Sequence, residues 1–373
     1  MALSLDTIAS AKRVCSTADV HETATTVVAV IPAHNEGACI ADTLRSIQRQ
    51  TTPPSRILVV ADNCTDDTAA VAAAAGADVL VLKDNAFKKA GALNAALDKL
   101  LPSLRDSDAI LEMDADSQLG ETWVESAVGA LGGNVGAVGA LYYGRSHTSV
   151  LAILQRNEYA RGSRWVERRD GSAYVLSGTA SLFLVGALRA VQRARKAHEL
   201  PGERVVYDIS SITEDFELTM ALKHLGYICV SPQGCTVITD VMTSWVALYH
   251  QRLRWQRGAV DLLRAYGYTQ ITRSYLLRSI YLLSGLSMAL LFWVALLSTI
   301  LLLGGIEASP LLALAMPAYL AERTWTVRRV GRRSVLLAAL LIPEMLYELF
   351  IQLLFVHAMF DSYRNLDRGW TAT

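Results

Sequence analysis

Cysteine is scarce in this chain of 373 residues, with only five in all. They are Cys15, Cys39, Cys64, Cys229 and Cys235, and no CxxC pair or Cys/His spacing occurs among them. An odd number without such spacing argues against a disulfide framework and against a zinc site. We therefore expect the protein to work in a reducing compartment.

Net charge is also lacking, because 35 Lys and Arg residues balance 35 Asp and Glu residues. Nonspecific binding of nucleic acid needs a basic surface, so no nucleic-acid partner is expected. The first 26 residues carry Lys12 and Arg13 but no apolar core of a signal peptide. The N-terminal half of the chain is therefore predicted to be cytoplasmic.

A glycine-rich phosphate loop is missing as well, since neither GxGxxG nor GxxxxGK[ST] occurs. These loops bind phosphate through closely spaced backbone N–H groups. A phosphate-bearing ligand of this chain would therefore need a metal ion or arginine side chains.

Hydrophobic residues, by contrast, make up 52% of the chain and concentrate after residue 275. Residues 279–306 are 28 positions without a charge, and a helix needs about 20 apolar residues to cross a bilayer. Residues 308–321 could form a re-entrant piece, a short tilted span or a hairpin arm. Residues 334–360 are predicted as a span whose Glu344 and Glu348 face protein or another subunit, or as an amphipathic helix in the interface.

Between these last two apolar segments lies an arginine-rich stretch, ERTWTVRRVGRRS, at 322–334. The positive-inside rule places it on the cytoplasmic side. We therefore expect two or three transmembrane helices within a membrane region at 273–373.

The first 245 residues show short apolar strands alternating with alanine-rich helical segments. This alternation is typical of an α/β domain with a parallel sheet, whose ligands bind beyond the carboxyl ends of the strands. The predicted strands are 27–32, 56–62, 78–82, 109–116 and 136–143, and two of the predicted helices are 38–50 and 66–76.

Carboxylates follow three of these strands. Glu36 comes after the first strand, Asp62 ends the second, and Asp114-Ala115-Asp116 ends the fourth. Each motif alone is more often a turn or a helix cap. Alternate carboxylates at a strand end also suit Mg²⁺ or Mn²⁺, which accept one or two carboxylates plus phosphate oxygens.

Two further polar groups follow. Thr213-Glu214-Asp215 stands just before a helical pattern. Its acidic residues could simply be stabilised by the positive end of the helix dipole, or one of them could act as a general base. HQRLRWQRG at 250–258 holds three arginines, two glutamines and a tryptophan. These arginines could contact anionic lipid or hold an anionic ligand.

The ordered set Asp62, Asp114-Ala115-Asp116, Thr213-Glu214-Asp215 and Gln251-Arg252-Leu253-Arg254-Trp255 resembles the D, DxD, TED, QxxRW signature of membrane-integrated family 2 glycosyltransferases, such as the cellulose, chitin and hyaluronan synthases. VIPAHNE, KKAGALNAAL at 88–97 and LSGTASLFLVGAL at 176–188 resemble other motifs of that family. The resemblance covers about residues 27–270. It implies a Rossmann-like GT-A domain at 27–245 after a tail at 1–26, then an interfacial amphipathic helix region at 246–272.

The resemblance also implies roles for individual residues. Asp215 would be the catalytic base, Asp116 would bind Mn²⁺ or Mg²⁺, and Arg254 would clamp the diphosphate of a UDP-sugar together with Gln251. Trp255 would form the floor of the acceptor site. Arg252, Arg257 and Arg264 are left to face lipid. The remaining substrate-binding residues would be Ala33, Glu36, Asp62, Lys89 and Asp114 near the nucleotide, Glu214 beside the base, and Gly178 and Thr179 at the acceptor.

The function expected from this resemblance is metal-dependent, inverting transfer of a hexose or N-acetylhexosamine from a UDP-sugar to a hydroxyl of a glycan, lipid or protein. The enzyme would be an integral membrane protein with a cytoplasmic catalytic domain. Unlike the large synthases, the chain has no apolar segment before this domain. It would therefore transfer one or a few sugars, or assemble as a homo-oligomer through its membrane helices. A catalytically silent nucleotide-binding membrane protein and a polyprenyl-phosphate sugar synthase are the alternatives.

Overall fold

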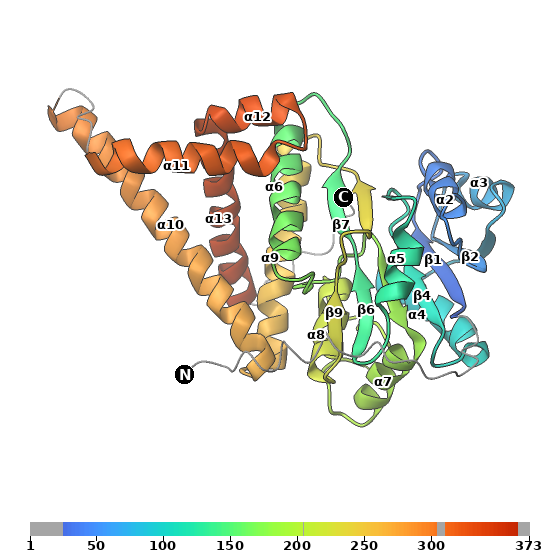
Figure 1. Ribbon diagram of the computed structural model, residues 1–373. Coiled ribbons are helices and arrows are strands. Elements are labelled where there is room, and N and C mark those ends of the chain that lie inside the picture. The colour runs from blue at the N-terminus through green and yellow to red at the C-terminus, as the bar shows by residue number, and fades with distance from the viewer. Residues whose placement is uncertain (1–24, 204, 304–309, 365–373) are drawn as a thin grey trace, which may run out of the picture.

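The computed structural model describes residues 25–203, 205–303 and 310–364. The N-terminal tail predicted at 1–26 lies almost wholly outside these residues. The described chain divides into an α/β part and a group of long helices beside it (Figure 1).

A seven-stranded sheet forms the centre of the α/β part, with strand order β3-β2-β1-β4-β8-β6-β9. Strands β1 to β4 are parallel, β8 is antiparallel to both of its neighbours, and β6 is parallel to β9. The parallel α/β sheet expected from the sequence is thus confirmed, with β8 as an antiparallel insertion. The strands are β1 (Val27–Ala33), β2 (Arg56–Asp62), β3 (Asp78–Leu82), β4 (Ala109–Glu112), β6 (Val135–Gly139), β8 (Ser181–Leu184) and β9 (Ile228–Val230).

Two predicted strands have different bounds in the structure. The strand predicted at 109–116 ends at Glu112, so the Asp114-Ala115-Asp116 motif lies on the loop that follows. The strand predicted at 136–143 is two strands, β6 and β7 (Leu141–Gly144), in different sheets. The chain leaves the large sheet at Ala140 and joins a three-stranded sheet with β5 (Gln118–Leu119) and β10 (Thr236–Thr239).

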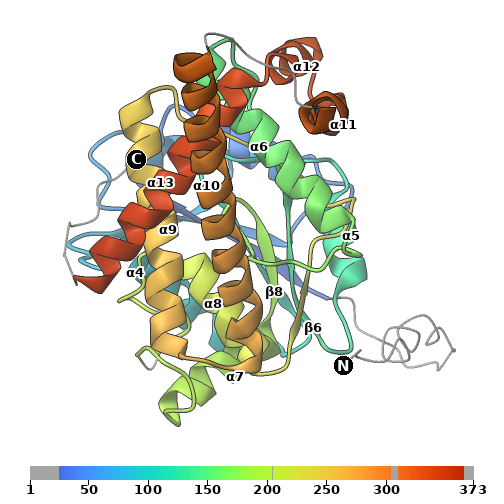
Figure 2. The same cartoon turned by 90° about the vertical axis from the view of Figure 1, so that its left-hand side faces the viewer.

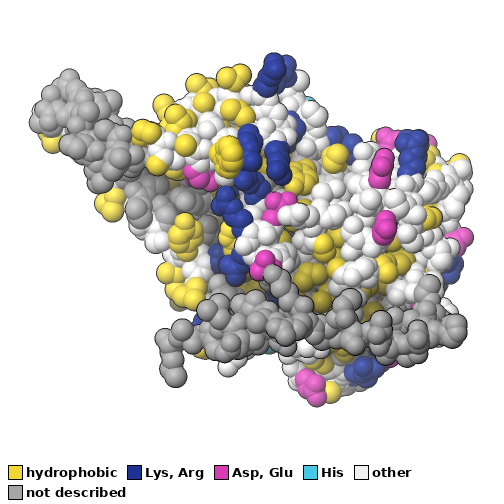
Figure 3. All heavy atoms as spheres, viewed as in Figure 1, with side chains coloured by type: hydrophobic (Ala, Val, Ile, Leu, Met, Phe, Trp, Pro, Cys, Tyr) yellow, Lys and Arg dark blue, Asp and Glu magenta, His cyan; other side chains and the backbone are white. Residues whose placement is uncertain are grey.

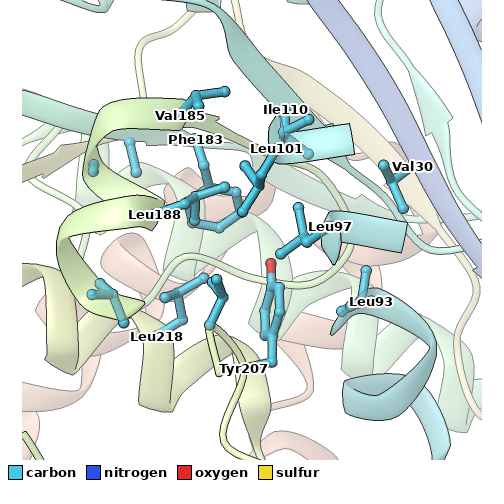
Figure 4. Packing of buried hydrophobic residues seen from close by; sticks show 14 of the residues in the cluster. Val30, Leu93, Leu97, Leu101, Ile110, Phe183, Val185, Leu188, Tyr207 and Leu218 are labelled. Carbon is cyan, nitrogen blue, oxygen red and sulfur yellow. The ribbon is translucent and has the colours of Figure 1, made fainter. Parts of the chain in front are cut away.

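Helices cover both faces of the large sheet. On one face α4 (Lys88–Leu100), α7 (Val185–Lys196) and α8 (Glu214–His224) bury one apolar core. Figure 4 shows Leu93 and Leu97 of α4 near Phe183, Leu188 and Tyr207 in this core. On the other face α2 (Ile40–Gln48), α3 (Thr68–Ala74) and α5 (Trp123–Ala130) bury a second core. The sheet is therefore the middle layer of three, and its strand ends are held at fixed positions.

The remaining helices stand beside the α/β part (Figures 1 and 2). Helix α9 packs along α13, with Leu253 against Leu354 and Ala358, and α6 packs against α11 and α12. They are α6 (Val150–Glu167), α9 (Trp245–Tyr266), α10 (Gln270–Leu303), α11 (Pro310–Val327), α12 (Arg332–Ala339) and α13 (Ile342–Tyr363).

The apolar C-terminal segments are helical, and one of them is interrupted. Residues 279–303 lie in α10, and residues 304–306 of that predicted span lie outside the described residues. Residues 334–360 form two helices rather than one, broken at Leu341, whose φ is 57°. Within the described residues α13 alone is long and apolar enough to cross a membrane, a property it shares with core helices of soluble proteins.

The side of α13 that carries Glu344 faces the same chain. Glu344 is 2% exposed, accepts a hydrogen bond from Asn157 at 2.8 Å and forms an ion pair with Arg161 at 2.6 Å. Glu348 forms an ion pair with Arg323 at 2.5 Å. Both carboxylates therefore have partners on α6 or α11, and neither needs a second subunit to neutralise it.

The expectation of lipid-facing arginines on α9 is wrong for Arg252, and Arg257 and Arg264 also have partners within the protein. Arg252 is 4% exposed and pairs with Glu158 of α6 at 2.9 Å. Arg257 pairs with Asp261 at 3.4 Å. Arg264 donates a hydrogen bond to the Ser362 hydroxyl at 3.1 Å. The Arg252 contact joins α9 to α6, because a buried guanidinium needs an anionic or polar partner, and the Arg264 contact joins α9 to α13.

Candidate active site

One large cavity lies at the carboxyl ends of β1, β2 and β4, where α9 and α10 approach the α/β part. Its volume is about 980 Å³. All thirteen site residues predicted from the sequence line it. They are Ala33, Glu36, Asp62, Lys89, Asp114, Asp116, Gly178, Thr179, Glu214, Asp215, Gln251, Arg254 and Trp255.

The last residue of β2, Asp62, lines this cavity. Its side chain is buried, and its Oδ1 atom has no hydrogen-bond partner among the described residues. Burial raises the pKa of Asp62, and a hydrogen bond with Asn85 opposes that rise. The loops after β1 and β2 turn at Asn35 and Asn63, with φ of 57° and 50°, a conformation that asparagine tolerates. An acceptor atom without a partner indicates a place where a ligand could donate a hydrogen bond.

Lys89 lies among carboxylates at the base of the cavity. Its ammonium is 2.7 Å from Asp114, 3.2 Å from Glu112 and 3.3 Å from Glu214. Despite burial, these three charges hold the pKa of Lys89 well above its usual value. The lysine therefore neutralises carboxylates in this structure, whereas the sequence led us to place it at the nucleotide or its diphosphate.

Gly178 fits closely against this cluster. A Cβ atom there would stand 2.4 Å from Nζ of Lys89, so a side chain would displace the ammonium. The backbone N–H of Gly178 also donates to Asp215 Oδ2 at 3.0 Å. One glycine thus contacts both the lysine and the predicted base.

Asp215 lies in the first turn of α8, just after the N-cap residue Thr213. Burial and the neighbouring Glu214 raise the pKa of Asp215 to about 6, while Lys89 and the Gly178 N–H oppose the rise. A carboxylate with a pKa near 6 is ionised at neutral pH and is a stronger base than an ordinary aspartate. This combination suits a general base.

Asp116 lies in an acidic part of the cavity. Burial and the charges of Asp114, Asp240 and Glu36 raise its pKa to about 7. No cationic side chain of the described residues forms an ion pair with Asp116, whose carboxylate accepts a hydrogen bond from the Ser117 hydroxyl at 3.1 Å. A divalent cation would offset this repulsion.

A metal ion at Asp116 would need ligands from a substrate. Within the described part of the chain, no three Asp, Glu, His or Cys side chains are grouped so as to hold a metal by themselves. Mg²⁺ commonly binds through one or two carboxylates together with substrate phosphate oxygens. The donor set at Asp116 fits that mode of binding.

Helix α9 contributes Gln251, Arg254 and Trp255 to the wall of the cavity. Gln251 is buried, and its Oε1 atom has no hydrogen-bond partner among the described residues. Arg254 and Trp255 line the cavity one turn further along. The Arg252 guanidinium lies 4.4 Å from the centroid of the Trp255 ring. The pair of Arg252 with Glu158 therefore also fixes the position of the tryptophan.

Two carboxylates of the site were not predicted from the sequence. Glu112 is 1% exposed and contacts both Lys89 and the Tyr207 hydroxyl. Asp240 follows β10, lines the cavity and pairs with Arg145. A glutamate within the apolar run AILEMD and an aspartate directly after a strand were the available signals.

Comparison with known proteins agrees with this geometry. The family model described as Glycosyl transferase family 2 matches residues 28–192. A poly-beta-1,6-N-acetyl-D-glucosamine synthase of Staphylococcus epidermidis is 25% identical over 284 residues, which are 71% of this chain and 61% of that protein. The match thus spans less than two thirds of that relative.

A solved structure has a similar fold over nearly the whole chain. The mannosyltransferase PcManGT of Pyrobaculum calidifontis, determined in complex with GDP-Man and Mn²⁺, superposes with a TM-score of 0.61. The match covers 97% of this chain and 95% of that one at 17% sequence identity, and it supports the fold alone. The chain therefore has a GT-A-like mixed α/β fold, and its residues 28–192 match the model of a Glycosyl transferase family 2 domain.

Proposed function

We propose that the protein transfers a hexose or an N-acetylhexosamine from a UDP-sugar to a hydroxyl acceptor, with inversion at the anomeric carbon. The observation that carries this proposal is the meeting of four distant motifs in one cavity. Asp62, the Asp114–Asp116 loop, Asp215 and the Gln251–Trp255 segment come from four separate elements and line the same space.

The base is assigned to Asp215. Its carboxylate would accept the proton of the acceptor hydroxyl while that oxygen forms a bond to the anomeric carbon. The bond between the anomeric carbon and the β-phosphate oxygen breaks in the same step, and UDP leaves with the electron pair. A base with a pKa of about 6 is mainly ionised at neutral pH, and a positioned base contributes about 10²–10⁴-fold to the rate.

The leaving diphosphate is assigned to the α9 wall and to the DxD loop. Arg254 can donate two parallel hydrogen bonds to phosphate oxygens, and the Oε1 atom of Gln251 can accept one from a hydroxyl of the donor. Asp116 would hold Mn²⁺ or Mg²⁺ together with phosphate oxygens of the donor. When bound, such an ion neutralises charge on the leaving group.

We also propose that the enzyme works at a membrane with its catalytic cavity on the cytoplasmic side. Apolar side chains of α10 and α13 are exposed, among them Leu291 at 69% and Leu353 at 50%. Figure 3 shows a row of Lys and Arg side chains between these helices and the α/β part. Exposed apolar surface next to basic side chains suits a bilayer with anionic headgroups.

Of the two alternatives, a silent nucleotide-binding protein has less support, because such a protein needs neither a base nor a diphosphate clamp in its cavity. A polyprenyl-phosphate sugar synthase is also less favoured, because the Thr213-Glu214-Asp215 and Gln251–Trp255 motifs that line the cavity suit transfer to a hydroxyl rather than to a lipid phosphate.

The test is UDP release by detergent-purified protein from a panel of UDP-sugars, with Mn²⁺, Mg²⁺ or EDTA. We expect metal-dependent release from one donor, abolished in Asp215→Asn. Asp98→Asn is the matched control, because Asp98 lies on α4 and does not line the cavity. Absence of release from every donor with either metal would contradict the proposal.

A further inference from the structure

The end of the cavity where α6 meets α10 differs in charge from the end that holds the DxD loop. We call this end the α6–α10 mouth, and define it by Trp165, Tyr174, Tyr275 and Arg278, which all line the cavity. The DxD end presents carboxylates that suit a metal and a diphosphate. The mouth presents aromatic rings and an arginine.

The rings of the mouth form a packed series that leads to the predicted base. Tyr174 lies 4.1 Å from Tyr275 and 6.1 Å from Trp165 between ring centroids. Phe216, which follows Asp215 in the chain, lies 6.4 Å from Tyr174 and 5.4 Å from Tyr275. An acceptor lying on these rings would therefore reach the carboxylate of Asp215.

Arg278 at the mouth and Arg169 near it both lie over aromatic faces. The Arg278 guanidinium lies 4.5 Å from the Tyr174 ring and 5.2 Å from the Trp165 ring, and Arg169 lies 4.6 Å from the Trp165 ring. Both arginines are exposed, and neither forms an ion pair with a carboxylate of the described residues.

Other arginines of the same helical region behave differently. Arg161 pairs with Glu344, Arg252 with Glu158 and Arg323 with Glu348. Each of those guanidinium groups joins two helices. Arg278 instead presents its charge at the cavity mouth, and Arg169, which does not line the cavity, lies over the Trp165 ring that Arg278 also contacts. Cation–π contact fixes these guanidinium planes without neutralising them.

We propose that the α6–α10 mouth binds an anionic group, a phosphate or a carboxylate, carried by the acceptor. Arg278 contacts this group with help from Arg169, and the rings of Trp165 and Tyr174 contact the apolar or sugar part next to it. Guanidinium groups suit this task because their planar donors match the two oxygens of such an anion. This inference rests on the proposed transferase function and names the class of acceptor.

The test compares matched acceptor probes in the UDP-release assay, with the full-length protein and its preferred donor. Glucose 6-phosphate and glucuronic acid are the soluble anionic probes, with glucose as their neutral counterpart. Dioleoyl phosphatidylglycerol, which carries a phosphate and free hydroxyls, is the lipid probe, with dioleoylglycerol as its neutral counterpart. We expect at least one anionic probe to raise UDP release above the rate without acceptor, and its neutral counterpart to have no effect. A response to phosphatidylglycerol alone assigns the anion to a lipid, and a response to a soluble probe assigns it to a free acceptor.

The variants are Arg278→Gln and, as a matched control, Arg273→Gln. Arg273 lies on the exposed surface of α10 and does not line the cavity. We expect Arg278→Gln to raise the half-saturating concentration of the active probe at least tenfold. Arg273→Gln should change neither that concentration nor UDP release without acceptor.

Three results would overturn the inference: equal stimulation by a neutral counterpart, no response to any anionic probe, or equal effects of the two variants. Failure of the transferase proposal itself would look different. UDP would then not be released from any donor, with or without a probe.

Discussion

The contact between Gly258 of α9 and Thr213 at the start of α8 links the two halves of the proposed mechanism. A Cβ atom on Gly258 would stand 2.4 Å from Oγ1 and 2.5 Å from Cγ2 of Thr213. Helix α9 carries Gln251, Arg254 and Trp255, and α8 carries Asp215. Gly258→Ala should therefore push the diphosphate clamp away from the base.

The magnitude follows from two opposed effects. Alanine in place of glycine in a helix gains up to about 1 kcal/mol. Overpacking of a buried contact costs about 1–3 kcal/mol. We expect Gly258→Ala to destabilise the protein by about 1 kcal/mol net, which lowers Tm by about 2 °C for a chain of this size. A shift of about 1 Å between catalytic groups can cost about 100-fold in rate, so turnover should fall at least tenfold.

The assay combines thermal unfolding with the turnover of UDP release. Gly129→Ala is the control, because Gly129 is exposed on α5 and a Cβ atom there meets nothing within 4 Å. It should raise Tm slightly and leave turnover unchanged.

A second substitution tests the cause. Thr213 makes no side-chain cap hydrogen bond, and its Oγ1 atom has no partner among the described residues. Thr213→Ala alone should therefore cost little. The double variant with Gly258→Ala should recover part of the lost turnover, because only the contact with Cβ of residue 213, at 2.9 Å, would be left. The reasoning is refuted if Gly258→Ala behaves like Gly129→Ala, or if Thr213→Ala restores nothing.

Four further predictions concern the site and the core. Asp215→Asn should lower transfer by about 10²–10⁴-fold and leave UDP affinity within twofold; equal loss of affinity, measured by calorimetry, would show that the base is misassigned. Because the base must be ionised and its pKa is raised to about 6, wild-type turnover should fall about tenfold per pH unit below pH 6 and level off above it, and a profile flat to pH 5 would contradict this. Arg254→Ala should weaken the binding of UDP more than that of uridine, whereas equal weakening would place the clamp elsewhere. Glu217 is 1% exposed and paired with Arg195, so Arg195→Met would leave its carboxylate as a buried unpaired charge. We expect the free energy of unfolding, measured by chemical denaturation, to fall by about 3–5 kcal/mol. The control Arg193→Met, on the same helix, should lower it by less than about 1 kcal/mol.

Much of the α/β part could be predicted from local sequence. The strands β1, β2 and β3 appear almost at their predicted bounds, since short apolar runs between helical segments have few other ways to bury their side chains. The start of α8 at Glu214 follows from acids beside the positive end of the helix dipole. Asp62 and the Asp114-Ala115-Asp116 motif could be placed at strand ends because they directly follow short apolar runs.

Other features depended on partners far away in the chain. Nothing near residue 140 shows that β6 and β7 belong to different sheets, because β7 pairs with β10, nearly a hundred residues later. The sequence near Lys89 likewise does not show that Glu112 and Glu214 neutralise it. Such pairings depend on which elements become neighbours, and local periodicity carries no information about that.

The sequence by itself thus determined the class of sheet and the strand-end carboxylates, because both depend on local pattern and residue type, and its resemblance to a known family indicated the residues proposed for the chemistry. Only the tertiary structure decided which charges are left for a ligand. Arg252 on α9 is occupied by Glu158 of α6, whereas Arg278 on α10 meets only aromatic rings at the cavity mouth. The two residues are alike in sequence, and they differ because a guanidinium takes its role from the groups that folding brings within a few ångströms of it.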